Sequence, residues 1–117
     1  MANDLKSVIC CRHSYGTSDR DQKRDIRDCR SGLDFICKAR PVEYKWKSGG
    51  DGKVHWGFVA QEIEGIVSPE TGIVGEYIAD GVPTKSLAYT ELVAPLVKAV
   101  QELRAEIDML KRGSGAP

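Results

Sequence analysis

Residues 89–111 have the sequence YTELVAPLVKAVQELRAEIDMLK, and this stretch decides the fold. Its apolar residues recur at alternating steps of four and three, a spacing that aligns them along one narrow stripe of an α-helix. The stripe comprises Tyr89, Val93, Leu96, Val100, Leu103, Ile107 and Leu110. Pro95 predicts either a kink or the true start of the helix near that position. The stretch predicts a rod of about 35 Å at the α-helical rise.

A lone amphipathic helix usually packs on its own domain, but two features of this one favour self-association. The apolar stripe is narrow and regular, and Glu106 and Lys111 flank it where they could pair between chains. We therefore predict an interchain seam. Its members are Val93, Leu96, Val100, Leu103, Ile107 and Leu110. The alternation of β-branched residues and leucine would by itself favour a parallel dimer, without fixing the number of chains.

Shorter elements are predicted before this helix. Residues 42–47 alternate apolar and polar side chains, and residues 53–60 return after a Ser-Gly-Gly-Asp-Gly loop, which predicts an antiparallel hairpin. Ser31 and Asp34 have the spacing of a capping box, so a helix is expected to begin there. That helix should end at Arg40, because the residue before a proline avoids the helical region.

Together with the remaining elements, the sequence predicts an α+β fold. A strand is expected at 5–12, a short helix at 61–67, and minor strands between 73 and 82. The expected architecture is a small antiparallel sheet with short helices and a long C-terminal helix that forms a coiled coil. Residues 113–117, Gly-Ser-Gly-Ala-Pro, are expected to form a flexible tail.

Composition excludes several functional classes. The 117 residues are 41% hydrophobic and 29% charged with a net charge of zero, which is globular and offers no basic surface for nucleic acid. No apolar run is long enough to span a membrane, and the N-terminus lacks the apolar segment of a signal peptide. The irregular spacing of Cys10, Cys11, Cys29 and Cys37 indicates reduced thiols rather than a metal site, and no cofactor is expected.

Ser18 and Lys23 are the residues most able to carry chemistry. A lysine can activate a serine nucleophile when it is removed from water far enough to lose its proton. An offset of five places the two side chains about 140° apart on a helix and on opposite faces of a strand, so they can meet only across a turn or between chains. The alternative is a solvated charged loop. His55 could be a second proton carrier or simply a half-buried strand residue.

Several sequence blocks occur together in one known family. They are Ser18-Asp19-Arg20, Lys23, Arg40-Pro41-Val42-x-Tyr44, Gly57-Phe58-Val59-Ala60-Gln61-Glu62 and Leu92 to Leu103. In this order the chain resembles the C-terminal intramolecular chaperone domain of phage endosialidases, tailspikes and tail fibres. The resemblance extends over about residues 16–112.

The resemblance implies a homotrimer that templates an upstream stalk of the same polypeptide and then releases itself by serine–lysine autoproteolysis. It matches Ser18 to the family's nucleophile, Lys23 to its base and His55 to a histidine near the reaction centre. We favour cleavage between Thr17 and Ser18, with the bond after Ser18 as the alternative. The implied setting is the host cytoplasm during phage assembly, with the domain then released from or attached to the virion tail fibre.

The domain organisation follows from the same resemblance. Residues 1–17 would end the stalk, 18–88 would form the chaperone core, 89–112 the coiled-coil helix and 113–117 the tail. Asp21 and Gln22 replace the basic and apolar residues that the family usually has, which bears on cleavage rate more than on fold.

Two rival functions use the same sequence differently. One is a trimerisation clamp of a phage fibre that shares the fold but never cuts itself. The other is a receptor-binding module, for which Trp46 and Trp56 are the available anchors. We rank the receptor-binding module last because packing within the predicted hairpin accounts for both tryptophans.

Overall fold

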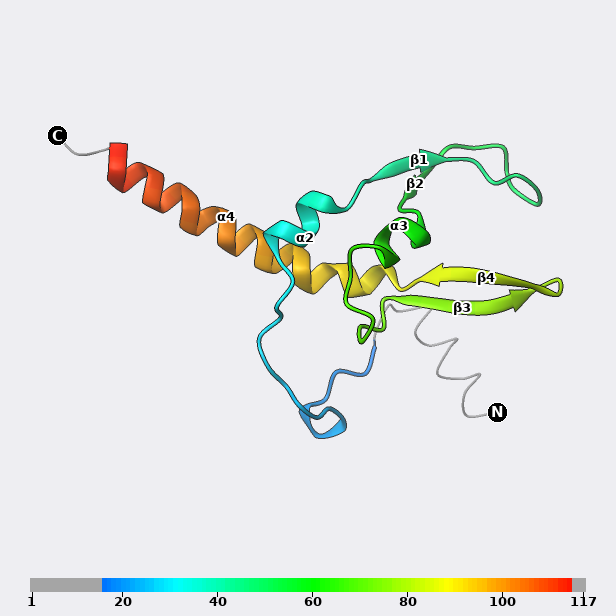
Figure 1. Cartoon of the computed structure of the whole chain (residues 1–117), viewed down its shortest axis with the longest axis horizontal. Helices are drawn as coiled ribbons and strands as arrows, with labels where there is room; N and C mark the ends of the chain where they lie inside the picture. Colours follow the sequence, from blue (N-terminus) through cyan, green and yellow to red (C-terminus); the bar gives the residue numbers. More distant parts are fainter. Residues whose placement is uncertain (1–15, 115–117) are drawn as a thin grey trace.

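A computed structural model describes residues 16–114 of the chain. Its elements are η1 (Arg20–Gln22), α2 (Leu33–Lys38), β1 (Val42–Tyr44), β2 (His55–Gly57), α3 (Ala60–Glu64), β3 (Val74–Ala79), β4 (Val82–Leu87), η2 (Tyr89–Leu92) and α4 (Val93–Ser114). Figure 1 shows two hairpins and the short helices gathered at the N-terminal half of α4, while its C-terminal half projects alone. The α+β class and the long C-terminal helix are confirmed, although the strands form two separate two-stranded sheets.

The first hairpin pairs β1 with β2. Its antiparallel register runs from Val42 opposite Gly57 to Tyr44 opposite His55. The ladder is therefore shorter than the two predicted strands, because the glycine-rich connection separates the chain segments beyond the last pair. Trp46, just past β1, packs edge-on against the Tyr44 ring with 5.1 Å between ring centroids.

The second hairpin pairs β3 with β4 over their whole length, from Val74 opposite Leu87 to Ala79 opposite Val82. Asp80 and Gly81 connect the strands, with φ of 49° and 76°. Positive φ at both central residues matches the right-handed twist of a hairpin, and Asp-Gly is a favoured pair for that turn. The sequence pattern predicted only minor strands here, although this dipeptide was the available signal for a hairpin.

α2 packs on α4, and this contact supplies much of the small buried core. Phe35 of α2 and Ala99 of α4 are both buried. The prediction that Ser31 caps α2 is wrong: the N-cap residue is Gly32, which has no side chain to offer. The helix does end before Arg40 and Pro41, as predicted.

α4 begins at Val93, directly after the turn of 3-10 helix η2. Pro95 is buried in its first turn, where its missing N–H would have had no partner inside the helix. Of the two predicted outcomes at this proline, a nearby helix start is therefore the correct one. α4 continues to Ser114, so the prediction of a flexible tail is wrong for residues 113 and 114, and residues 115–117 lie outside the described range.

The strand predicted at 5–12 also lies outside the described residues, as does most of the proposed end of the stalk. Within residues 16–114, no helix has the length and apolar character needed to cross a membrane.

Candidate functional site

A single turn of 3-10 helix, η1, organises the segment between Ser18 and Lys23. Asp19 is its N-cap residue: the backbone is extended, and the side chain accepts a hydrogen bond from the N–H of Asp21 at 2.9 Å. Backbone bonds from Gln22 to Asp19 and from Lys23 to Arg20, each 3.1 Å, close the turn. An aspartate side chain satisfies a backbone donor that a helix start would otherwise leave without a partner.

This turn brings the two candidate catalytic side chains together. Lys23 Nζ donates a hydrogen bond to Ser18 Oγ at 2.7 Å. Because the two residues flank the turn instead of lying within one regular element, an offset of five is no obstacle to their contact. A nucleophile and a base at this distance form the minimal geometry for serine activation.

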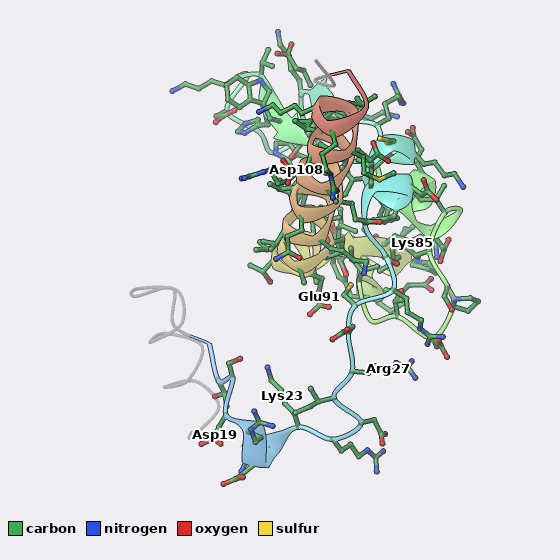
Figure 2. All side chains as sticks on the ribbon, turned by 90° about the vertical axis from the view of Figure 1, so that its left-hand side faces the viewer. Asp19, Lys23, Arg27, Lys85, Glu91 and Asp108 are labelled. Atoms are coloured by element: carbon green, nitrogen blue, oxygen red, sulfur yellow. The ribbon has the colours of Figure 1, made fainter. Side chains whose placement is uncertain are left out.

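Ser18 and Lys23 lie on an exposed arm, which we define as residues 16–31. Figure 2 shows Asp19 and Lys23 well away from the packed elements around α4. Every residue from 16 to 30 is exposed in the single chain, Thr17 included. Further along the arm, Asp25 has φ of 55°, a left-handed conformation that aspartate tolerates better than most residues. The Ser18–Lys23 hydrogen bond is therefore present in the single chain, but both side chains are exposed to solvent.

His55 lies elsewhere, on the β1–β2 hairpin. Its Nε2 is 2.9 Å from Asp51 Oδ1, and its half-buried ring lies 5.9 Å from the Tyr44 ring. The bond to His55, followed by one from the backbone N–H of Lys53, holds the pKa of Asp51 below its ordinary value. Asp51 was not predicted as a site residue. The sequence indicated this pairing only through the position of Asp51, four residues before His55 across a turn.

Within one described chain, His55 is not brought to the Ser18–Lys23 pair. In Figure 1 the β1–β2 hairpin and the arm with η1 extend in different directions from the packed elements. A contact between His55 and the pair would therefore have to come from another copy or from a rearranged arm.

The predicted seam forms an exposed stripe on α4, which we call the α4 stripe. Its exposed fractions are 57% for Val93, 50% for Leu96, 59% for Val100, 44% for Leu103, 46% for Ile107 and 71% for Leu110. The side of the helix next to this stripe carries Pro95 and Ala99, which are buried. α4 thus packs on its own domain through one face and presents the α4 stripe on another.

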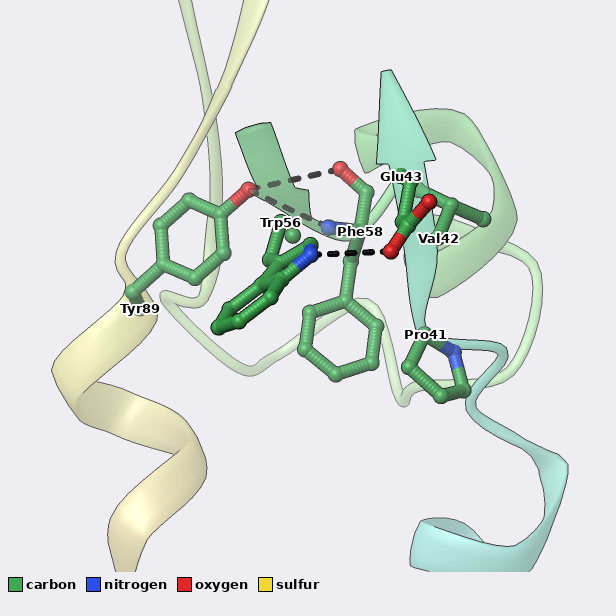
Figure 3. A pocket seen from close by; sticks show the side chains of 7 residues that line it. Pro41, Val42, Glu43, Trp56, Phe58 and Tyr89 are labelled. Carbon is green, nitrogen blue, oxygen red and sulfur yellow. Dashed lines mark hydrogen bonds between the residues drawn. The ribbon is translucent and has the colours of Figure 1, made fainter. Parts of the chain in front are cut away.

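The two tryptophans differ in their surroundings. Trp46 packs on Tyr44, as predicted for a residue of the hairpin. Trp56 is 82% exposed, so packing within the hairpin does not account for its position. Trp56 Nε1 donates to Glu43 Oε1 at 3.0 Å. Its ring borders a pocket of about 480 Å³ that Phe58 and Tyr89 also line (Figure 3).

Tyr89 connects that pocket to the start of α4. Its hydroxyl accepts a hydrogen bond from the Phe58 N–H at 3.2 Å and lies 3.4 Å from the Phe58 carbonyl oxygen, to which it donates (Figure 3). Gly57 has no side chain at this point because a Cβ there would overlap the Tyr89 hydroxyl. Tyr89 therefore packs against the end of β2, and we do not include it in the α4 stripe.

Two of the sequence blocks also meet in the structure. The Arg40 guanidinium makes two hydrogen bonds to the Glu62 carboxylate, at 2.9 Å and 2.5 Å. Arg40 follows α2, and Glu62 lies in α3. This paired contact holds the pKa of Glu62 below its ordinary value, and it joins the Arg-Pro-Val block to the Gly-Phe-Val-Ala-Gln-Glu block.

Comparison with known families agrees with these features. Residues 18–73 match a family model described as chaperone of endosialidase, whose name also classes it among the peptidases. The matched segment contains residues 18–31 of the arm, both blocks joined by Arg40 and Glu62, and the first hairpin. No curated protein and no solved structure shows a significant match to the chain. The resemblance found in the sequence is confirmed, and with it a chaperone role.

Proposed function

We propose that this chain is an intramolecular chaperone that assembles as a homotrimer, templates the folding of an upstream fibre or tailspike stalk, and then cuts itself off next to Ser18. The observation that carries the proposal is the 2.7 Å contact between Lys23 Nζ and Ser18 Oγ, inside a segment that matches the endosialidase chaperones. The reaction is a single self-directed cut that takes place in the host cytoplasm during phage assembly.

The proposed chemistry needs only these residues and water. Neutral Lys23 accepts the Ser18 hydroxyl proton while Oγ bonds to the carbonyl carbon of Thr17. The bond from that carbon to the Ser18 nitrogen then breaks, and the nitrogen takes the proton from Lys23. The resulting ester joins Thr17 to Oγ. Water opens it, leaving a carboxyl on Thr17 and restoring the hydroxyl of Ser18.

The exposure of the pair makes assembly a condition of cleavage. An amine serves as a base near neutrality only when it is removed from water. Both side chains are exposed in the single chain, so the covering surface must come from another copy or from the stalk. A domain that cuts only after assembly would not release an unfolded stalk, and removal of the template would then trap the folded stalk kinetically.

The α4 stripe supports the assembly step. Its heptad spacing matches coiled-coil packing, and the contact with α2 uses a different face. A stripe with β-branched residues at one core position and leucine at the other would by itself favour two strands, so three chains require contacts from the α+β core as well.

Intact-mass spectrometry tests the proposed cleavage. Wild type should yield fragments 1–17 and 18–117 on incubation, whereas Ser18→Ala and Lys23→Ala should both remain intact. Lys38→Ala, a change to another exposed lysine, should cleave like wild type. Persistence of intact wild type after long incubation, or cleavage of Ser18→Ala at the wild-type rate, would refute the mechanism.

The second candidate is a trimerisation clamp that never cuts. The exposure of Ser18 and Lys23 favours it, together with Asp21 and Gln22 between them. It predicts the same oligomer by sedimentation equilibrium, with no change in mass. The two candidates therefore share the sedimentation result and differ in the mass spectrum.

A further inference from the structure

A second, smaller pocket lies between α2 and the start of α4. It has a volume of about 210 Å³ and an almost wholly apolar lining. Its walls are Ile36, Ala39, Pro41, Phe58, Leu92 and Leu96. Leu96 is also a member of the α4 stripe, so the pocket opens directly beside the surface that the proposed coiled coil would use.

The heptad positions beside the α4 stripe change character along the helix. Placing Val93 and Val100 at position a and Leu96 at position d assigns the flanking positions e and g to particular residues. Position g just before the first heptad is Leu92, the last residue of η2, and the first position e is Val97 in α4. The later positions are Ala99, Arg104, Glu106 and Lys111. Charged residues usually occupy e and g, where they pair between helices. The first pair is instead wholly apolar, and Val97 is 51% exposed.

The pocket lies on the g side of α4. α2 packs on α4, and Ala99 at position g of α4 is buried. Leu92, also at g, lines the pocket that α2 helps to form. In parallel coiled coils the g residue of one helix faces the e residue five positions further along the next helix. The residue that faces Leu92 in a second copy is then Val97.

We propose that Val97 of a second copy fills this pocket in the assembled protein, an inference that rests on the proposed self-association. The contact joins the core of one copy to the helix of the next, so the α4 stripe does not associate alone. It also selects the parallel arrangement, because antiparallel helices would not place positions 92 and 97 opposite each other. Glu106 and Lys111 would form the corresponding charged pair two heptads further along.

The first test compares two substitutions on the exposed surface of α4. Val97→Lys would place an ammonium group in the apolar pocket of the neighbouring copy and should weaken self-association at least tenfold in sedimentation equilibrium. Gln101→Lys adds the same side chain at an exposed position away from the stripe and should leave association within about twofold of wild type. Circular dichroism checks that both variants keep the α4 helix.

The second test is disulfide capture. In a background with the four native cysteines replaced by serine, Leu92→Cys combined with Val97→Cys should give covalent dimers and trimers on oxidation, while each single variant should not. The pocket contact would be refuted if Val97→Lys associated as strongly as wild type, or if the double variant did not cross-link. Neither result would contradict the coiled coil itself. A monomeric wild type would overturn the proposed self-association, and the pocket contact with it.

Discussion

The backbone N–H of Leu33 donates a hydrogen bond to Glu102 Oε1 at 2.9 Å, so the long helix provides the N-terminal cap that α2 lacks. Gly32, the N-cap residue, has no side chain that could do this. Residues 69 positions apart thereby attach the chaperone core to the proposed coiled-coil helix.

Glu102→Ala should destabilise the fold by about 1 kcal/mol, since the loss of a capping acceptor leaves a helix donor without its partner. The measurement is the free energy of unfolding in urea at fixed protein concentration, because association would make it concentration dependent. Gln101→Ala is the matched control, an exposed neighbour on the same helix. Equal effects of the two substitutions would show that the Leu33–Glu102 bond contributes nothing.

Gly32→Ala should be more damaging. A Cβ at this position would overlap Glu102 Oε1 and lie 2.9 Å from Lys98 Cγ, so either the Glu102 side chain would leave the Leu33 N–H or α2 would shift away from α4. Overpacking of this kind costs about 1–3 kcal/mol. Gly72→Ala, where a Cβ meets nothing within 4 Å, is the control. The same urea experiment applies, and a Gly32→Ala protein as stable as the control would argue against close α2–α4 packing.

Asp19→Ala should slow self-cleavage roughly tenfold, if the proposed chemistry holds, because the turn that joins Lys23 to Ser18 loses its side-chain cap. Asp19→Asn should retain most of the rate, since its amide oxygen still accepts the bond. Asp21 takes part through its backbone alone, so Asp21→Ala is a control for the loss of charge. Cleavage rates come from intact mass against time, and identical rates for all three variants would exclude a role for the cap.

His55→Phe should raise the pKa of Asp51 toward its ordinary value, because the bond to His55 is the main cause of its lowering. A carboxyl group with a depressed pKa stabilises the fold at pH values above its unfolded-state pKa. That contribution is lost as pH falls through the folded-state pKa. Titration of the Asp51 carboxyl carbon by NMR measures the shift. Val54→Ala, a change to the adjacent residue, should leave the midpoint unchanged, and an unchanged midpoint in His55→Phe would contradict the assignment.

The first hairpin and the helix ends show how far sequence patterns reach. Alternation predicted β1, the glycine-rich loop predicted the return of the chain as β2, and the proline after Arg40 predicted the end of α2. Both signals are local, and a few neighbouring residues suffice to produce them. The start of α2 was predicted wrongly because its cap comes from Glu102, far along the chain, and a capping-box pattern contains only near neighbours.

The candidate site was found only in part. Ser18 and Lys23 were named from residue type and from the family resemblance, but their contact depends on the η1 turn, whose cap by Asp19 was not foreseen. Asp51 was missed because its connection to His55 crosses a glycine-rich loop.

The sequence by itself determined the long helix, its apolar stripe and the similarity of residues 18–73 to the chaperones of endosialidases, because periodicity and motif order are properties of the chain alone. Only the tertiary structure decided which face of α4 is covered. Pro95 and Ala99 lie under neighbouring elements while Leu103 and Ile107 remain exposed. Periodicity reports which residues share a face, but what covers that face depends on the packing of segments remote in sequence.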